Sequence, residues 1–239
     1  MRSELRSVHE SVRLLGLTAS LRLGLIRLLR DRSVEDRSFD RKHRTDTAGM
    51  VPKDALGIDD PLVRAEAVFY VPSPARVTRY LIRQLGIDAA EWAFMDLGAG
   101  KGRVLLVASE WPFRRLLGSE ISPALVALAR ENVTRYRGKG NVSRIELRCS
   151  DARQVDFPPE DTVLHLYHPF GFYILRAVLR RLEGSLAARP RRLKVLYLAA
   201  SKNVLDVFAE FPFLRLVRFV PCPEPKYSFA LFETSQAGS

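Results

Sequence analysis

The chain has few of the residues that build disulfide scaffolds and metal sites. Its 239 residues include only two cysteines, Cys149 and Cys222, and four histidines. The two cysteines lie far apart and have no metal-ligand spacing, so we expect neither a disulfide framework nor a zinc site. This pattern favours a reducing compartment and ordinary core or loop positions for both cysteines.

Long hydrophobic runs are also missing from the sequence. Residues 5–30 are rich in leucine, but arginines interrupt them every few positions. A membrane-spanning helix needs ~20 nearly uninterrupted apolar residues, and a secretory signal needs a compact apolar run before a small-residue cleavage site. We therefore expect a cytoplasmic protein. The period of the leucines and valines predicts an amphipathic helix, which either lies on an anionic membrane or a partner, or packs against its own domain or a second copy.

Acidic residues are too few to balance the basic ones. With 38 Lys and Arg against 27 Asp and Glu, the formal net charge is +11. A basic protein attracts phosphates and anionic surfaces, which makes nucleic acid a candidate partner. The arginines are scattered along the whole chain, however, and charge alone discriminates weakly between partners. A nucleic-acid substrate is thus the alternative and not the leading hypothesis.

The middle of the chain predicts one main domain after an N-terminal part. Residues 31–48 are nearly all polar, which predicts a linker or surface loop. We accordingly divide the chain into residues 1–48, an amphipathic helix and a polar linker, and residues 49–239, the main domain. A helix is expected at 74–85, where Ser73 and Pro74 form a helix-start signature.

From residue 93 onward, short apolar runs alternate with longer stretches of helical period. The predicted strands are 93–97, 115–120, 144–148, 162–167 and 193–199. The predicted helices are 102–110, 123–136, 172–187 and 203–211. This alternation predicts a parallel sheet covered by helices on both faces. Two further runs, 214–220 and 227–233, are separated only by a turn-like stretch, so they should be antiparallel neighbours.

A glycine-rich loop follows the first predicted strand. Asp96 precedes glycines at every second position, namely Gly98, Gly100 and Gly102. Glycines at a strand-to-helix turn allow tight backbone conformations and close approach by a ligand. The dinucleotide spacing G-x-G-x-x-G would require glycine where Arg103 stands. The loop therefore favours a cofactor without a pyrophosphate, with a purely structural turn as the alternative.

Acidic residues follow the next two strands. Glu120 ends the second strand, close to the ~20-residue offset at which a carboxylate accepts hydrogen bonds from ribose hydroxyls. Asp151 follows the third strand, where its carboxylate and the N–H of Ala152 could bind an adenine ring. The alternatives are a solvated strand-end acid for Glu120 and a turn residue or helix cap for Asp151.

With these residues in place, the sequence resembles the class I S-adenosylmethionine-dependent methyltransferases over roughly residues 68–233. The resemblance implies an α/β, Rossmann-like fold with a seven-stranded, mostly parallel sheet and a C-terminal antiparallel hairpin, here with an N-terminal helical extension. It also implies S-adenosyl-L-methionine as the cofactor. By this resemblance, residues 96–102 hold the methionine part, Glu120 the ribose, and Asp151 with Ala152 the adenine.

Two shorter motifs give a narrower resemblance. The segment FYVPSP, residues 69–74, and the segment LYHPFG, residues 166–171, look like a poorly characterised bacterial group of methyltransferases. That group is distantly similar to protein-lysine methyltransferases with a Tyr-x-Pro-Ser/Thr element before a DLGxGxGR loop. The similarity implies that Tyr70 and Ser73 border the methyl donor.

The acceptor side is expected at Tyr167, His168 and Phe170, where the fourth strand ends. In amino-methylating relatives an Asn or Asp at the position of His168 grips the target nitrogen while an aromatic ring packs beside it. His168 could act as a general base, since histidine titrates near neutral pH, or be a hydrogen-bonded loop residue. His165 should point to the opposite face, which argues against a two-histidine metal site.

Together these features predict a methyltransferase that acts on a nitrogen of a protein side chain or of a small molecule. The alternatives are an RNA or DNA methyltransferase and a non-catalytic S-adenosylmethionine-binding protein. Sequence does not identify the acceptor, because acceptor pockets are assembled from loops laid over a shared fold.

Overall fold

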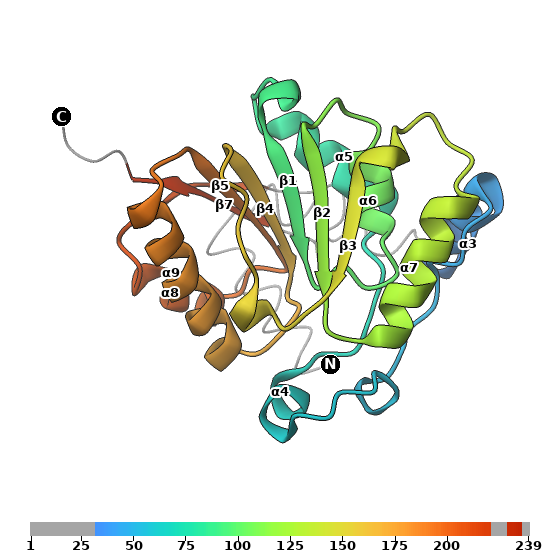
Figure 1. Ribbon diagram of the computed structural model, residues 1–239, viewed down its shortest axis with the longest axis horizontal. Helices are drawn as coiled ribbons and strands as arrows, with labels where there is room; N and C mark the ends of the chain where they lie inside the picture. The colour runs from blue at the N-terminus through green and yellow to red at the C-terminus, as the bar shows by residue number, and fades with distance from the viewer. Residues whose placement is uncertain (1–31, 221–228, 236–239) are drawn as a thin grey trace, which may run out of the picture.

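The computed structural model describes residues 32–220 and 229–235, which form a single seven-stranded sheet with helices on both faces (Figure 1). The strands lie in the order β3-β2-β1-β4-β5-β7-β6. Their bounds are β1 Ala93–Leu97, β2 Arg115–Glu120, β3 Ile145–Cys149, β4 Thr162–Tyr167, β5 Leu193–Leu198, β6 Leu214–Val220 and β7 Phe229–Thr234.

Strands β1 to β5 pair in parallel, and β7 is antiparallel to both β5 and β6. The predicted mostly parallel sheet with a C-terminal antiparallel pair is therefore confirmed. All five residues of β1 are buried, as expected for a mostly apolar strand in a sheet that helices cover on both faces, although one of the five is Asp96.

Helices cover the sheet in two layers. Helices α5 (Ala75–Gln84), α6 (Arg103–Ala108) and α7 (Pro123–Arg135) lie on one face, where Ala129 of α7 packs beside Gly102 at the start of α6. Helices α8 (Phe172–Ala188) and α9 (Lys202–Ala209) pack against the other face (Figure 1). Ser122 caps α7 by accepting a hydrogen bond from the N–H of Leu125, with Pro123 at the first helical position. Helix α5 is instead preceded by Pro74, so Ser73 is not its cap.

The linker predicted at residues 31–48 is wrong for most of its length, because Arg32–His43 form helix α3. Phe39 and His43 lie one helical turn apart and are buried against Tyr136 of the α7 end. Two buried residues are enough to hold a helix whose other positions are polar. Such a helix has no sustained apolar period by which its sequence could be recognised. The amphipathic helix predicted at residues 5–30 lies outside the described residues.

Residues 49–73, which we call the roof segment, cross the carboxyl ends of the strands. The segment contains η1 (Lys53–Ala55) and helix α4 (Pro61–Glu66), which Asp60 caps. Backbone hydrogen bonds pair Val51 with Tyr70, the two ends of the segment. Figure 1 shows α4 beyond the strand ends, away from the packed helix layers. Among the residues with a described structure, no helix is long and apolar enough to cross a membrane.

Candidate functional site

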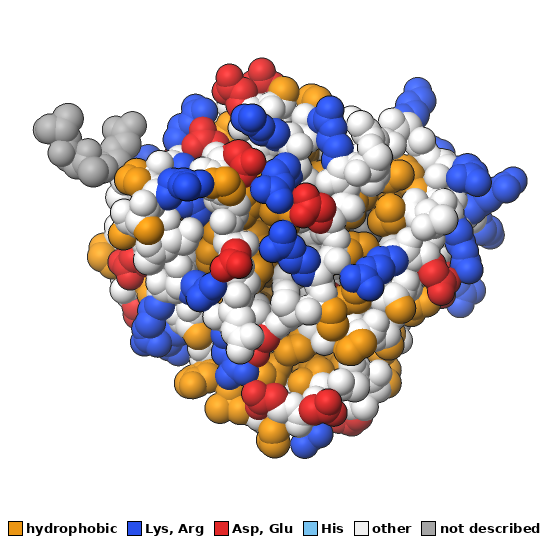
Figure 2. Space-filling model, in the orientation of Figure 1, with side chains coloured by type: hydrophobic (Ala, Val, Ile, Leu, Met, Phe, Trp, Pro, Cys, Tyr) orange, Lys and Arg blue, Asp and Glu red, His pale blue; other side chains and the backbone are white. Residues whose placement is uncertain are grey.

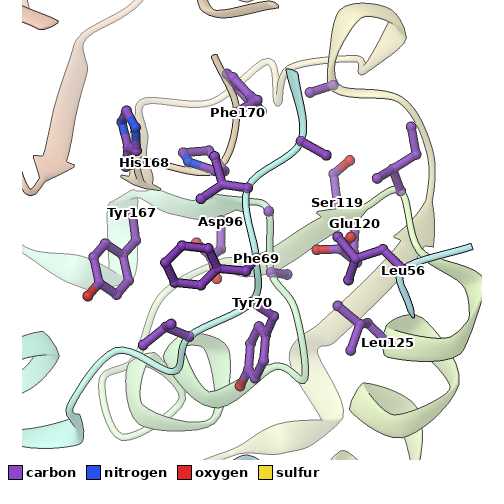
Figure 3. Close-up of a pocket in the computed structure, with 18 of the residues that line it drawn as sticks. Leu56, Phe69, Tyr70, Asp96, Ser119, Glu120, Leu125, Tyr167, His168 and Phe170 are labelled. Atoms are coloured by element: carbon purple, nitrogen blue, oxygen red, sulfur yellow. The ribbon is translucent and has the colours of Figure 1, made fainter. Parts of the chain in front are cut away.

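A cavity of about 300 Å³ lies between the roof segment and the carboxyl ends of β1, β2 and β4 (Figure 3). All the predicted site residues except Gly100 and Gly102 line it, namely Tyr70, Ser73, Asp96, Gly98, Glu120, Asp151, Ala152, Tyr167, His168 and Phe170. Figure 3 shows Phe69 and Tyr70 on the chain that crosses the view, with Asp96 next to Phe69 and with Ser119 and Glu120 on the right of this chain. The sequence motifs, which are spread over about 100 residues of chain, thus meet at one edge of the sheet.

The glycine loop adopts backbone conformations that favour glycine. The φ angles of Gly98, Gly100 and Gly102 are +79°, +53° and +84°. A Cβ on Gly98 would lie 2.4 Å from Cβ of Pro169, and a Cβ on Gly100 would lie 2.2 Å from Cε2 of Tyr70. The close approach expected at these two glycines is therefore made by the protein's own side chains.

Glu120 ties the glycine loop to the end of β2. Its Oε2 accepts a hydrogen bond from the N–H of Gly100 at 2.9 Å, and its Oε1 accepts one from the N–H of Ser122 at 2.9 Å. Burial raises the pKa of this carboxyl, against the lowering effect of the backbone N–H donors. The side chain also lines the cavity.

Asp151 is a helix cap and an ion-pair partner in this structure. It caps η4 (Ala152–Gln154) by accepting a hydrogen bond from the N–H of Arg153, and its Oδ2 lies 2.6 Å from the Arg153 guanidinium. The same guanidinium reaches Oδ2 of Asp60 at 2.9 Å. Arg153 thus links the floor of the cavity to the roof segment, a role that nothing in its sequence position indicated.

His165 and Asp96 form a buried pair on neighbouring strands. Nδ1 of His165 lies 2.7 Å from Oδ1 of Asp96, and both side chains are almost completely buried. His165 and His168 both line the cavity. His168 lies beyond the strand end with φ of +40°, where strand alternation no longer applies. His165 was not among the site residues expected from the sequence.

His168 is held by a buried tyrosine that the sequence analysis also missed. Its Nδ1 lies 2.9 Å from the hydroxyl oxygen of Tyr197 on β5. Burial lowers the pKa of His168 and raises that of Tyr197, so both groups are neutral near pH 7. With Nδ1 engaged, Nε2 is the ring nitrogen left to face a ligand.

Aromatic rings complete the wall around His168. Phe170 is buried and pairs through its backbone with Ala67 of the roof segment. Tyr167 also lines the cavity, and Phe69 of the roof segment is half exposed at it. In the part of the chain that the structure describes, no group of three His, Cys, Asp or Glu residues could hold a metal ion, and Cys149 is exposed.

Comparison with known proteins gives matches to methyltransferases. Residues 94–187 match a family described as "Methyltransferase domain". A curated relative, the type II methyltransferase M.XamI of Xanthomonas campestris pv. amaranthicola, is 29% identical over 129 residues, which are 53% of this chain and 24% of that protein. The chain therefore spans about a quarter of the length of the curated relative that it matches.

Two solved structures have a similar fold. The mitomycin 7-O-methyltransferase MmcR has a TM-score of 0.52 at 18% identity, over 96% of this chain and 72% of that one. A SAM-dependent methyltransferase from Aquifex aeolicus has a TM-score of 0.50 at 16% identity, over 67% of this chain and 93% of that one. At these identities the likeness concerns the fold.

Proposed function

We propose that this chain, which has the fold of the class I S-adenosylmethionine-dependent methyltransferases and contains a methyltransferase domain, transfers a methyl group from S-adenosyl-L-methionine to an acceptor. The observation that carries the proposal is the single cavity into which the glycine loop, two buried carboxyls and the His168 loop all converge. Open α/β sheets bind their ligands at this edge.

The residues of the cavity fit the cofactor. In the proposed arrangement Asp96 and the loop that carries Gly98, Gly100 and Gly102 hold the methionine part, and Glu120 accepts the ribose hydroxyls. Asp151 and Ala152 contact the adenine, with apolar walls supplied by Leu56 and Leu125 (Figure 3). Ser73 borders the donor with a buried hydroxyl that has no hydrogen-bond partner among the described residues. Tyr70, whose ring covers Gly100, closes the same end.

The cofactor supplies an activated methyl group on a sulfonium. When bound, the donor would give this methyl group to the acceptor lone pair, and the electrons of the broken carbon–sulfur bond would stay on sulfur. The chain aligns the two partners, since an in-line displacement depends mainly on position. His168 can take a proton from an acceptor that arrives protonated.

The acceptor that we propose is a nitrogen of a protein side chain or of a small molecule. Pro169 packs directly against Gly98, so the loop with His168 lies beside the proposed methionine end of the donor. Tyr167 and Phe170 would flank the target group, and His168 Nε2 would contact it. This arrangement resembles the Asn-containing element of amino-methylating enzymes in its place at the end of β4.

Two further parts of the proposal concern the whole chain. We assign residues 49–239 to the methyltransferase domain, with residues 39–48 packed against it, and residues 1–48 to an N-terminal extension. We also propose a cytoplasmic location, with peripheral membrane contact through residues 5–30 as the alternative. Deleting residues 1–31 and measuring vesicle binding separates these locations.

Calorimetry with S-adenosylmethionine and S-adenosylhomocysteine tests the first half of the proposal. We expect both to bind, and binding of neither would refute it. Incubating cell extract with methyl-labelled donor and the purified protein tests the second half, because the size class of the labelled product identifies the acceptor. Donor binding with no labelled product would instead favour a non-catalytic donor-binding protein.

A nucleic-acid methyltransferase is the second candidate. The curated relative is a type II methyltransferase, and the chain has a net charge of +11. Labelled RNA or DNA in the same extract experiment would favour this candidate over a protein or a small-molecule acceptor.

A further inference from the structure

The ring of His165 presents an unsatisfied nitrogen to the cavity. Its Nε2 is buried and has no hydrogen-bond partner among the described residues, although the side chain lines the cavity. Only 1% of the residue is exposed. Buried polar atoms in native proteins nearly always have a partner, so an orphaned one beside a cavity indicates a missing ligand group.

The other ring nitrogen determines what kind of group is missing. Oδ1 of Asp96 lies 2.7 Å from Nδ1 of His165, and an ionised carboxylate can only accept hydrogen bonds. Nδ1 therefore carries the proton. In a neutral imidazole the second nitrogen is then an acceptor. Nε2 thus requires a hydrogen-bond donor from the ligand.

Two more acceptor atoms lie at the same cavity. The hydroxyl of Ser73 is buried without a partner among the described residues, and the Asp96 carboxylate, whose Oδ1 contacts His165, has a second oxygen, Oδ2. Both side chains line the cavity together with His165. An ammonium group has three N–H donors, which matches these three acceptors, and its positive charge complements the Asp96 carboxylate.

The order of the strands places these acceptors at one end of the proposed donor. Across β3, β2, β1 and β4 the polar residues follow in the order Asp151, Glu120, Asp96 and His165. If adenine lies at Asp151 and ribose at Glu120, the amino-acid end of the donor lies at Asp96 and His165. This step rests on the proposed function.

We infer that Nε2 of His165, together with Asp96 and Ser73, binds the α-ammonium group of the methyl donor. His165 is therefore a cofactor-binding residue, and the Asp96–His165 pair selects donors that carry an amine at this end.

The test compares ligands that differ only at the amino-acid end. S-adenosylhomocysteine carries the amine and the carboxylate, its decarboxylated analogue carries the amine alone, and 5′-methylthioadenosine carries neither. In His165→Asn the amide N–H still faces Asp96, but the far ring nitrogen is gone. We expect this variant to bind the two amine-bearing ligands about 10-fold to 100-fold more weakly and 5′-methylthioadenosine within about twofold of the wild type.

Two controls separate binding from folding. His43→Asn removes another buried histidine that contacts Tyr136 away from the cavity, and it should leave all three affinities unchanged. Ser73→Ala removes an acceptor that takes no part in a strand, and it should weaken only the amine-bearing ligands. It keeps the test valid if His165 variants fail to fold.

Three results would overturn the inference. Unchanged affinity for S-adenosylhomocysteine in folded His165→Asn would do so, as would an equal loss for 5′-methylthioadenosine, which would make His165 a support of the cavity wall. A loss for S-adenosylhomocysteine but not for its decarboxylated analogue would assign the ring to the carboxylate. A wild-type protein that binds none of the ligands would contradict the proposed function instead.

Discussion

At the scale of single residues, the cavity holds one carboxyl, that of Glu120, whose burial opposes its ionisation. Burial raises the pKa of Glu120, and the nearby charge of Asp96 adds to the effect. A raised carboxyl pKa contributes stability that is fully present below the unfolded pKa of about 4.5 and is lost as the pH rises through the folded value. The fold thus keeps a carboxyl where ionisation is unfavourable, as expected of a ligand-binding group.

This property predicts pH-dependent donor binding. Ribose hydroxyls donate to an ionised carboxylate more strongly than to a protonated one, so the affinity for S-adenosylhomocysteine should fall as the pH is lowered through the raised pKa of Glu120. In Glu120→Gln the affinity for S-adenosylhomocysteine should fall by about 10-fold at most, and this pH dependence should disappear. Calorimetry from about pH 8 to about pH 5 measures it. Equal slopes in the two proteins would contradict the prediction.

His168 predicts a pH effect on stability that is opposite in sign to the effect of Glu120 on stability. Burial lowers its pKa below 6.5, so the unfolded chain takes up a proton before the folded protein does. Its contribution to stability is present above pH 6.5 and is lost as the pH falls through the folded value. The wild type should therefore lose stability relative to His168→Asn on acidification. Urea unfolding of both proteins at about pH 7.5 and about pH 5.5 tests this, and parallel behaviour would disprove it.

The site residues that could be predicted from sequence lie at or near the end of a predicted strand. Asp96, Glu120 and His168 stand at or near strand ends, and all three line the cavity. His165 and Tyr197 were missed because their partners are on neighbouring strands. Pairing of Asp96 with His165 follows from the register of β1 and β4, which no single segment of sequence contains.

At the scale of elements, the strands were predicted almost to the residue. Buried parallel strands are short continuous apolar runs, and the helices between them have a clear period. Helix α3 was missed because its buried face consists of Phe39 and His43 among polar residues. The chain just after α3 is held by long-range hydrogen bonds, such as the one that Arg103 donates to the Thr47 hydroxyl.

Gly98 in the glycine loop and Gly184 in α8 can be compared under the same substitution, glycine to alanine. Gly98→Ala places a Cβ against Pro169 at a φ of +79°, so we expect a loss of stability of roughly 1–2 kcal/mol or more and weaker donor binding. Gly184→Ala lies inside α8 with no atom within 4 Å of the new Cβ, and it should stabilise by roughly 0.5–1 kcal/mol. Denaturant unfolding measures both. A Gly98→Ala protein as stable as the wild type would contradict the expectation.

At the scale of the whole molecule, positive charge is distributed and partly paired. Figure 2 shows Lys and Arg side chains interspersed with acidic and hydrophobic ones over the face in view. Several arginines form ion pairs, as Arg79 does with Glu110 and Arg176 with Glu210. A paired charge contributes less to the field that attracts phosphates.

We therefore expect only non-specific binding to nucleic acid. Duplex DNA and RNA should bind weakly, with an affinity that falls steeply between about 50 mM and about 200 mM salt, because such binding depends on counterion release. No methyl label should enter either nucleic acid. Fluorescence anisotropy at several salt concentrations and the labelled donor measure the two properties. Tight binding that persists in high salt, or labelled DNA, would support the second candidate function.

The acceptor side of the cavity was the hardest part to predict, because contacts between distant parts of the chain form it. The roof segment lies before residues 94–187, which match the methyltransferase family, and it has no strand or long helix of its own. Its position depends on contacts such as that between Glu66 and the backbone of Gly171. Local sequence patterns predict elements, and this part of the cavity wall is held by contacts between them.

The roof segment also bears on how fast the protein can work. Three sets of contacts hold it across the cavity. Val51 pairs with Tyr70, Arg153 binds Asp60, and Glu66 of α4 accepts hydrogen bonds from backbone N–H groups at the start of α8. A molecule as long as the proposed donor has to pass these hydrogen bonds and the ion pair on entry and again on exit. Local opening of a few surface hydrogen bonds, and not the displacement at carbon, would then set the turnover rate.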